Sequence, residues 1–533
     1  MTFASAFRAV VASMIIAAAP CLKGHLDECR WATPLEWHVD PIFELRLKRP
    51  PKGSREAVQI LFDQLRDAIV DGRLAPGARM PATRKSAVFF GVSRNTCAAV
   101  YEKLLGAGHL TSRHGAGTFV APHRSAPPRA KREADTLDDR LNPVWLSPAV
   151  ASAMGFWREP PARDATAKSV VADFRPALVD PKYFPFDVFR RVSAKQMRRL
   201  ERIPPSLKSP QGNQGNHSLR IAATQHIALT RAIGCRPSDV LITSGAQQAF
   251  DLLARILIQP GKTIVAVEDP GYPPLRVPFS AAGAVVVPVP VDAEGMIVEA
   301  LPPNTKVICV TPSHQFPLGV AMSPARRQAL LAYAIEHNAV IVEDDYDGEF
   351  RYDGSPLEAL KAADNSDVVF YVGTFSKCLL PSLRLGFLVA PDWAMHTLVA
   401  AKNAMDWHCS IPLQMTVASF IADGHLARHV RKMRDLYRRR RELLRRGFDG
   451  PLAQWFEPIP SFYGMHMTAI ARPGVDVESA AALVLAEGVK IHTLDRYHLG
   501  TPTRTGLIFG YGAATPAQLA LGIKKLCRAL SKD

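Results

Sequence analysis

Residues 371–388, YVGTFSKCLLPSLRLGFL, decide the fold of the larger part of this chain. The apolar residues on either side of the central segment predict two buried strands. Lys377 closely follows the first strand, after small hydroxyl residues, and stands seven positions before an arginine. A lysine placed in this way can form a Schiff base with an aldehyde, while Thr374, Ser376 and Arg384 supply donors and charge for a phosphate. The stretch therefore predicts a site for a phosphorylated aldehyde.

A second motif, IVEDDYDGEF at 341–350, adds groups for an aromatic ring. Asp344 ends a predicted buried strand, where a carboxylate needs a cation or a hydrogen-bond donor. A protonated pyridine nitrogen would be such a partner, and Tyr346 could bond to a phenolic oxygen on the same ring. Glu343 and Asp345 would equally suit a solvated turn. Together with Lys377, these residues predict pyridoxal 5′-phosphate as the cofactor.

Two further motifs predict contacts with the same cofactor. In TSGAQQAF (243–250), a strand ends at Gly245, and a helix begins near Ala246 and Gln247. Backbone N–H groups at a helix start form a phosphate site, although an ordinary strand–helix turn has the same sequence pattern. In EDPGYPPLR (268–276), Tyr272 stands on a loop fixed by proline and glycine, and it could stack on the pyridine ring or be a core tyrosine.

Working outward, short Val/Ile-rich segments alternate with helical patterns from about residue 170 onward. Continuous apolar segments bounded by Gly and Pro predict buried parallel strands in an α/β fold. The chain has 533 residues, 47% of them hydrophobic and 21% charged, which excludes a disordered or fibrous protein. Its eight cysteines lack a CxxC pair, which argues against a zinc site or a disulfide scaffold and favours reduced thiols in a cytoplasm.

The formal net charge of +16 indicates a polyanionic partner, and two segments carry nearly all of it. Residues 40–125 have a net charge of +7, and residues 428–446 have +8. The second segment predicts a helix with a solvated basic face. Its predicted buried residues are Val430, Met433, Leu436, Leu443 and Leu444.

The N-terminal segment predicts a helix-turn-helix with a wing. Residues 56–71 space their apolar side chains as one helix face, TRKSAVFF predicts a second helix, and Gly91 predicts a turn before a third. Ser93 caps that third helix, which would point Arg94, Asn95 and Thr96 at bases or phosphates. The following HLTSRHGAGTFV predicts a hairpin. The candidate DNA contacts are Ser93, Arg94, Asn95, Thr96, and Arg113, His114 and Gly115 at the hairpin tip.

Four segments follow from these patterns. Residues 1–38 are expected to be a dispensable extension, although the apolar run 9–19 also suits a signal peptide. Residues 40–122 form the DNA-binding domain, and residues 123–169, rich in Pro and Arg, predict an extended linker. Residues 170–533 form the cofactor-binding domain. No stretch reaches the length of a membrane span, so we expect no membrane contact and a cytoplasmic location.

The order of motifs RLAPGARMPATR, GVSRNT and GHLTSRHGAGTFV resembles the winged helix of the GntR family. The resemblance implies that the chain binds double-stranded DNA and adds Arg84 to the expected DNA contacts. The motifs from SGAQQAF to LRLGF resemble fold-type I aminotransferases over roughly residues 170–530. This implies a mainly parallel sheet with helices on both faces and a smaller C-terminal α/β part.

Joined together, the two resemblances identify the chain as similar to the MocR-type subfamily of GntR regulators. They imply Lys377 as the cofactor lysine, Asp344 at the pyridine nitrogen, Tyr346 at the phenolic oxygen and Arg384 at the phosphate. Within TPSHQFPLG, His314 and Gln315 stand close to where aminotransferases place an asparagine on the phenolic oxygen. The resemblance further implies a homodimer that binds paired half-sites of an operator.

Three departures from the aminotransferase pattern bear on function. Pro210 replaces the tyrosine that reaches the neighbouring subunit's phosphate, and Ile508 stands about where an arginine would bind the substrate carboxylate. Pro274 stands where effector-binding relatives carry a second arginine, so Arg276 or Arg504 would have to substitute.

These departures favour a regulator that senses pyridoxal phosphate, alone or as an adduct with an amino compound. The alternatives are an active aminotransferase that carries a DNA-binding domain, and a degenerate body that only dimerises the DNA-binding heads.

Overall fold

The computed structural model describes residues 56–122, 140–147, 150, 151, 153, 156, 170–202, 212–352 and 358–531. The chain divides into two compact units, Met1–Leu137 and Asp138–Asp533, and each is described here by itself. The predicted extension 1–38, most of the predicted linker and Pro210 lie outside the described residues.

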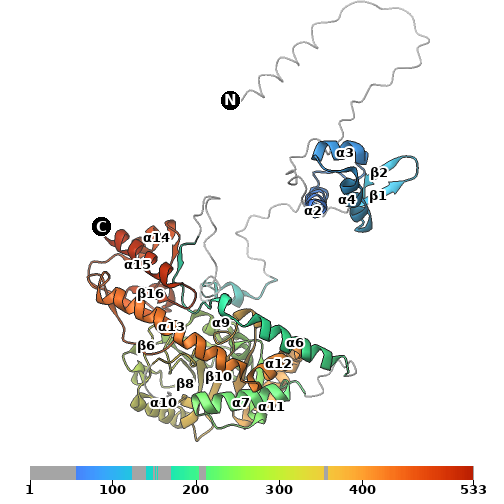
Figure 1. The fold of residues 1–533 in the computed structure, drawn as a ribbon. Coiled ribbons are helices and arrows are strands. Elements are labelled where there is room, and N and C mark those ends of the chain that lie inside the picture. The colour runs from blue at the N-terminus through green and yellow to red at the C-terminus, as the bar shows by residue number, and fades with distance from the viewer. Residues whose placement is uncertain are drawn as a thin grey trace, which may run out of the picture. The chain divides into compact units, whose positions relative to one another are not determined.

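The smaller unit contains the predicted helix-turn-helix and wing. Leu61, Leu65 and Leu104 are buried in its core, where the helices meet. Gly91 ends the second helix with a φ of +67°, which a glycine adopts without strain. Ser93 then caps the third helix, because its Oγ accepts a hydrogen bond of 3.0 Å from the backbone N–H of Thr96. The elements are α2 (Ala57–Val70), α3 (Thr83–Phe90), α4 (Arg94–Gly106), β1 (Leu110–Arg113) and β2 (Gly117–Val120) (Figure 1).

The larger unit is built on a sheet of eight strands, which is mainly parallel as predicted. The strands β5, β6, β8, β9 and β10 pair in parallel, whereas β11 is antiparallel to both of its neighbours and β7 is antiparallel to β6. The carboxyl ends of β4, β9 and β10 therefore meet at one edge, the usual ligand edge of such a sheet. In spatial order the strands are β4 (Val240–Thr243), β11 (Gly386–Val389), β10 (Val369–Thr374), β9 (Val340–Asp345), β8 (Thr305–Val310), β5 (Ile264–Asp269), β6 (Val285–Asp292) and β7 (Gly295–Met296).

Helices cover both faces of this sheet. Leu241 packs into a cluster with Phe250 and Phe279 on one face, whereas its neighbour Ile242 packs with Leu219 on the other. Burying each such side chain contributes roughly 1.5–3 kcal/mol. One face carries α8 (Ala246–Leu257), α9 (Pro273–Ala281) and α11 (Asp392–Met405), and the other carries α7 (His217–Arg231), α10 (Pro324–Glu336) and α12 (Ile411–Ala422), which packs on α6 (Phe186–Leu200).

The smaller C-terminal part has its own antiparallel sheet and lies at one end of the larger unit, around α14 and α15 (Figure 1). A short parallel pair joins it to the chain that follows the predicted linker, because Val489 pairs with Ala172. Its elements are β3 (Ala172–Asp173), α13 (His425–Asp449), β12 (Phe456–Pro458), β13 (His466–Ala471), α14 (Val477–Ala486), β14 (Val489–Lys490), β15 (His492–Thr493), β16 (Gly506–Gly510) and α15 (Pro516–Leu530).

The basic helix α13 differs in part from its prediction. Val430, Met433 and Leu444 are buried as predicted, but Leu443 is exposed. Arg440 is instead fully buried. Its guanidinium replaces the lost water contacts by donating to Asp180 at 3.1 Å and to the carbonyl of Tyr511. None of the helices in the described part of the chain combines the length and apolar character needed to cross a membrane.

Part of the predicted linker packs on the larger unit. A 3₁₀ helix at Pro143–Leu146 lies against α9. Val150, Ala153 and Phe156, which follow it, are all buried, whereas Ala151 is exposed. The stretch rich in Pro and Arg therefore contains a segment that belongs to the folded body.

Candidate functional site

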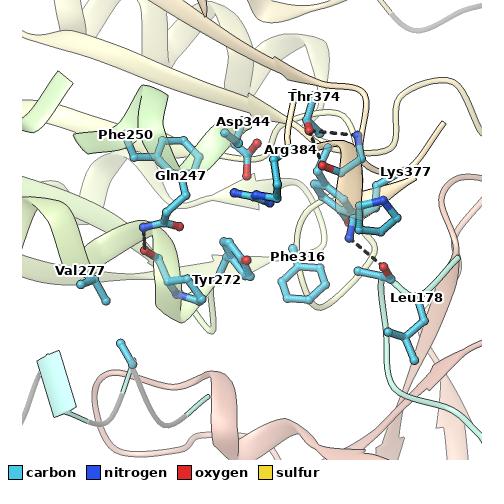
Figure 2. Close-up of a pocket in the computed structure, with 17 residues that line it drawn as sticks. Leu178, Gln247, Phe250, Tyr272, Val277, Phe316, Asp344, Thr374, Lys377 and Arg384 are labelled. Atoms are coloured by element: carbon cyan, nitrogen blue, oxygen red, sulfur yellow. Dashed lines mark hydrogen bonds between the residues drawn. The ribbon is translucent and has the colours of Figure 1, made fainter. Parts of the chain in front are cut away.

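A cavity of about 550 Å³ lies at the carboxyl edge of the parallel strands (Figure 2). It collects Asp344 from β9, Thr374 from β10 and Ala246 from the start of α8. Nine of the eleven predicted cofactor residues line it: Ala246, Gln247, Tyr272, Asp344, Tyr346, Thr374, Ser376, Lys377 and Arg384.

Lys377 lies just beyond β10, and its amine points into the cavity. The Nζ atom donates a hydrogen bond of 2.7 Å to the carbonyl of Ala177, a residue with a φ of +63°. Burial lowers the pKa of Lys377 from 10.5 to about 8, while Asp347 and Asp344 act in the opposite direction. Near physiological pH the neutral, nucleophilic fraction of this amine is therefore much larger than that of an ordinary lysine.

Asp344 lies beside Lys377 on the cavity wall and fits the predicted pyridine contact. Burial raises its pKa from 3.8 to about 8, with further increases from the neighbouring carboxylates of Asp345, Asp347 and Glu268. Its Oδ1 atom is buried and has no hydrogen-bond partner among the described residues. A buried carboxylate without a partner is costly unless a donor or cation reaches it. A protonated ring nitrogen would satisfy this oxygen.

Arg384 and Gly245 form the predicted phosphate end of the cavity. The Nη2 of Arg384 donates to the carbonyl of Ser244 at 3.2 Å, which brings the guanidinium beside the start of α8. A Cβ atom on Gly245 would lie 3.0 Å from Nη2, and the φ of this glycine is +79°. Gly245 therefore allows the close approach even though it does not line the cavity itself. A guanidinium next to free helical N–H groups is a strong anion site.

Hydroxyl groups complete this end of the cavity. The Oγ1 of Thr374 donates to the Oγ of Ser376 at 3.0 Å, and the backbone N–H of Ser376 donates to Thr374 Oγ1 at 3.2 Å. Both hydroxyls thus stay at the edge of the cavity. Gln247 contributes differently, because its side chain donates to the carbonyl of Pro274 at 2.9 Å and ties α8 to the loop that carries Tyr272.

Tyr272 and Phe316 form an aromatic wall, with ring centroids 5.5 Å apart and planes at 90°. Tyr346 also lines the cavity, and its hydroxyl donates to the carbonyl of His314 at 3.0 Å and lies 2.8 Å from the Nδ1 of the same histidine. That Nδ1 lies 3.0 Å from a carboxylate oxygen of Asp347. The predicted phenolic-oxygen contact, Tyr346, is thus oriented by a buried histidine–aspartate pair.

Gln315 is the predicted cofactor residue that the structure places elsewhere. It is absent from the described cavity lining, and its amide donates to the carbonyls of Pro270 and Phe316, each at 2.9 Å. The chain turns so that His314 faces Tyr346 while Gln315 lies behind the wall. Gln315 therefore connects the loops that carry Tyr272 and Phe316, and its direct contact with the cofactor stays a prediction.

The two arginines considered as substitutes for carboxylate binding do not line the described cavity, and neither does Ile508, which stands where the arginine is missing. Ile508 is fully buried in β16 within an apolar cluster. Arg276 lies in α9 beside a separate small cavity, and Arg504 is exposed. Among the described residues that line the main cavity, the cationic side chains are Lys377 and Arg384.

The sequence did not indicate several residues that shape the cavity. Phe316 stands within the quoted motif TPSHQFPLG, but Ala177 and Ala153 carry no chemical group that would mark them. Ala177 contributes a carbonyl through an unusual backbone angle, which sequence patterns do not reveal. The cavity residues that were not predicted as cofactor contacts are Ala153, Ala177, Leu178, Phe250, Pro274, Val277, Phe316 and Pro381.

The smaller unit presents the predicted DNA contacts on its surface. Arg94 and Asn95 are exposed in the first turn of α4, and Arg84 is exposed on α3. Thr96 is half-buried, and its hydroxyl hydrogen-bonds to that of Ser93 at 2.8 Å, so these two residues also fix the helix start. At the wing tip, Arg113, His114 and Gly115 are exposed, with the Arg113 guanidinium 4.9 Å from the ring centroid of Phe119.

Comparison with protein families gives two matches. Residues 183–518 match the family "Aminotransferase class I and II", and residues 58–120 match "Bacterial regulatory proteins, gntR family". The chain is 34% identical over 467 residues to a probable rhizopine catabolism regulatory protein, MocR, of Rhizobium meliloti. That alignment covers 87% of this chain and 92% of the relative.

Two further relatives support the same architecture. A pyridoxine biosynthesis transcriptional regulator, PdxR, of Corynebacterium glutamicum is 30% identical, with 85% of this chain and 91% of the relative covered. Among solved structures, a kynurenine aminotransferase of Pyrococcus horikoshii superposes with a TM-score of 0.63 at 27% identity, covering 68% of this chain and 92% of that protein.

Proposed function

We propose that this chain, which belongs to the MocR-type regulators, is a transcriptional regulator controlled by pyridoxal phosphate or by an adduct of that cofactor with an amino compound. In these regulators a GntR DNA-binding domain precedes an aminotransferase class I and II domain. The winged helix binds an operator, and the cavity at Lys377 binds the signal. One relative is described as a regulator of pyridoxine biosynthesis, which agrees with a B6 vitamer as the signal.

The observation that carries this proposal is the unpartnered Oδ1 of Asp344, in a cavity that also holds Lys377 and Arg384. The unpartnered oxygen of Asp344 is costly without a ligand, and one molecule offers a partner to all three groups. The cofactor has an aldehyde for the amine, a basic ring nitrogen for the carboxylate and a phosphate for the guanidinium.

Each residue then has a defined task. Lys377, with its lowered pKa, offers a neutral amine to the aldehyde. Asp344 holds the proton on the ring nitrogen, and Arg384 with the N-terminus of α8 binds the phosphate. Tyr272 and Phe316 shield the ring from water. When bound, the cofactor supplies an aldehyde that exchanges between amines, which lets a second amine enter the site.

The regulatory step requires that ligand distinguish two states. A ligand that binds both arrangements of a regulator equally well shifts nothing, so occupancy of the cavity must favour one arrangement of the DNA-binding heads. We propose a homodimer that presents two DNA-binding domains to paired half-sites of the operator. Once one domain is bound, the linker and the dimer together set the effective concentration of the other domain near its own half-site.

A working aminotransferase is the second candidate, and the match of residues 183–518 to that family favours it. Full turnover of an ordinary amino acid also requires a cation for the substrate carboxylate. The cationic side chains of the described cavity lining, Lys377 and Arg384, are already used by the cofactor. Mixing the cofactor-loaded chain with single amino acids and following the cofactor spectrum distinguishes the candidates, because transamination converts the cofactor to its amine form.

The direct test of the sensor is covalent trapping. The full chain is incubated with pyridoxal phosphate, reduced with borohydride and digested for mass spectrometry. We expect a pyridoxyl label on Lys377, no such label in Lys377→Ala, and normal labelling in the control Lys262→Ala, whose lysine is exposed on the surface. Absence of the label at Lys377 in the unmodified chain would exclude the proposal.

A further inference from the structure

Val150, Ala153 and Phe156 lie within the predicted linker, residues 123–169, and pack onto the cofactor-binding body. Val150 and Ala153 are buried in one apolar cluster with Val277 of α9. Ala151, on the same short segment, is exposed. The buried positions therefore face the body, and the exposed one faces solvent.

Phe156 anchors the end of this segment. Its ring centroid lies 6.1 Å from that of Tyr272 and 5.1 Å from that of Tyr497, both edge-on. Its carbonyl accepts a hydrogen bond of 3.1 Å from Arg496, whose guanidinium also lies 5.8 Å from the Phe156 ring centroid. Edge-to-face aromatic pairs of this kind contribute about 0.5–1.5 kcal/mol each beyond burial. The segment is thus attached to the wall that carries Tyr272.

The cavity has two chemically different sides. Figure 2 shows Asp344, Thr374, Arg384 and Lys377 together on one side, and Tyr272, Phe316 and Val277 on the other. The first side carries the groups that fit the cofactor. Ala153 lines the cavity and packs with Val277, which places it on the second, apolar side. The second, apolar side of the cavity is therefore left for the substituent that the amino compound adds to the cofactor.

We propose that Ala153, held against the body by the packing of Val150 and Phe156, recognises the substituent of the amino compound and determines its permitted size. The inference rests on the proposed function, since it assumes that a pyridoxal phosphate adduct occupies the cavity. It adds that the adduct contacts the segment of chain that leads back to the DNA-binding unit. The favoured substituent is apolar, because Ala153, Val277 and Phe316 offer it no polar partner.

This arrangement gives the ligand a direct mechanical effect. An adduct with a substituent long enough to contact Ala153 stabilises the packed segment, whereas the cofactor alone does so less. Differential contact with one state is what a ligand needs to shift a conformational equilibrium. The substituent would then decide how firmly Val150, Ala153 and Phe156 pack on the body.

The test uses stable reduced adducts as probes on the full chain, measured by titration calorimetry. The probes are N-(5′-phosphopyridoxyl)methylamine and the matching adduct of 3-methylbutylamine. In Ala153→Leu we expect the affinity for the larger adduct to fall about tenfold or more, which corresponds to about 1.4 kcal/mol of overpacking. The affinity for the smaller adduct should stay within about twofold. The matched control Ala151→Leu, at the exposed position, should bind both adducts as the unmodified chain does.

Hydrogen exchange of the peptide that contains residues 150–156 supplies a second readout without any substitution. The larger adduct should slow exchange there more than the smaller one. Equal affinities of Ala153→Leu and Ala151→Leu for the larger adduct, or exchange in 150–156 that does not change, would overturn the inference. If the unmodified chain binds neither the smaller adduct nor pyridoxal phosphate, the proposed function itself fails, which is a distinguishable result.

Discussion

Asp344 and Lys377 line one cavity from the ends of the adjacent parallel strands β9 and β10, and burial moves both of their pKa values to about 8 from opposite directions. The acid is harder to ionise and the amine is harder to protonate than in water. A site with this pair is costly to the fold but suited to a ligand that brings a basic nitrogen and an electrophilic aldehyde.

The first prediction concerns the stability of the chain stripped of cofactor. Because the native pKa of Asp344 is raised from 3.8 to about 8, the native state binds this proton more tightly than the unfolded state does. The group therefore destabilises the fold progressively between about pH 4 and pH 8, at most by ~1.4 kcal/mol per pH unit. Asp344→Asn should raise the free energy of unfolding of the stripped chain by on the order of 1–3 kcal/mol at pH 8. Its thermal midpoint should therefore rise more at pH 8 than at pH 5.

Differential scanning calorimetry at the two pH values checks this. The control Asp187→Asn changes an exposed carboxylate on α6 and should leave the pH dependence as it is. The same substitution at 344 should weaken pyridoxal phosphate binding, since the ring nitrogen loses its carboxylate. An equal stability difference at pH 5 and pH 8 would contradict the raised pKa.

The second prediction concerns how fast the amine captures the cofactor. The pKa of Lys377 is lowered from 10.5 to about 8 by burial, so its neutral fraction rises through pH 8 and is nearly complete by pH 9. Stopped-flow measurement of the visible cofactor band should show a capture rate that rises up to about pH 9 and then levels. A rate that keeps rising to pH 10.5, as for free lysine, would show an unperturbed amine.

The third prediction tests the close approach of Gly245 and Arg384. A Cβ at position 245 would lie 3.0 Å from the guanidinium, and the positive φ adds backbone strain. Gly245→Ala should therefore weaken binding of pyridoxal phosphate by about tenfold or more, a cost of about 1.4 kcal/mol or above. Pyridoxal, which lacks the phosphate, should be affected much less.

Gly234→Ala is the matched control for this comparison. An added Cβ at Gly234 meets no atom within 4 Å, and its φ is outside the strained region. It should bind both vitamers normally. If Gly245→Ala weakens the binding of both vitamers equally, the assignment of this end of the cavity to the phosphate is wrong.

The fourth prediction concerns DNA. Arg94 is exposed in the first turn of α4, the expected recognition helix. Arg94→Ala should therefore weaken operator binding. It should also reduce the slope of the logarithm of the affinity against the logarithm of the salt concentration by about one, because about one fewer counterion is released. Arg66 lies on α2 and pairs with Asp63 at 2.9 Å, so Arg66→Ala should leave both quantities unchanged. Fluorescence anisotropy over a salt series measures them. Equal effects of the two substitutions would place the DNA contact elsewhere.

The sequence predicted the fold and the polar side of the cavity well, because both depend on local patterns. Buried strands and the residues that follow them at one sheet edge can be inferred from apolar segments and small-residue loops. For this reason Lys377, Asp344 and Arg384 were placed correctly in one cavity.

The apolar side could not be predicted in the same way. Ala153 reaches the cavity because a segment of the Pro-rich stretch packs on α9, and this depends on tertiary contacts rather than on any local pattern. Gln315 does not line the described cavity, because adjacent residues in a loop face opposite directions and the sequence does not show which one faces inward. The burial of Arg440 depends on a partner, Asp180, that is 260 positions away.

The central claim is that a ligand held by Lys377 changes DNA binding by the winged helix of the same chain. The most direct measurement is the affinity of the full chain for the DNA flanking its own gene, with and without pyridoxal phosphate, in the unmodified chain and in Lys377→Ala. The account predicts that the cofactor changes the affinity of the unmodified chain about tenfold or more and leaves that of Lys377→Ala unchanged. The same response in both proteins, or no response in the unmodified chain, would contradict it.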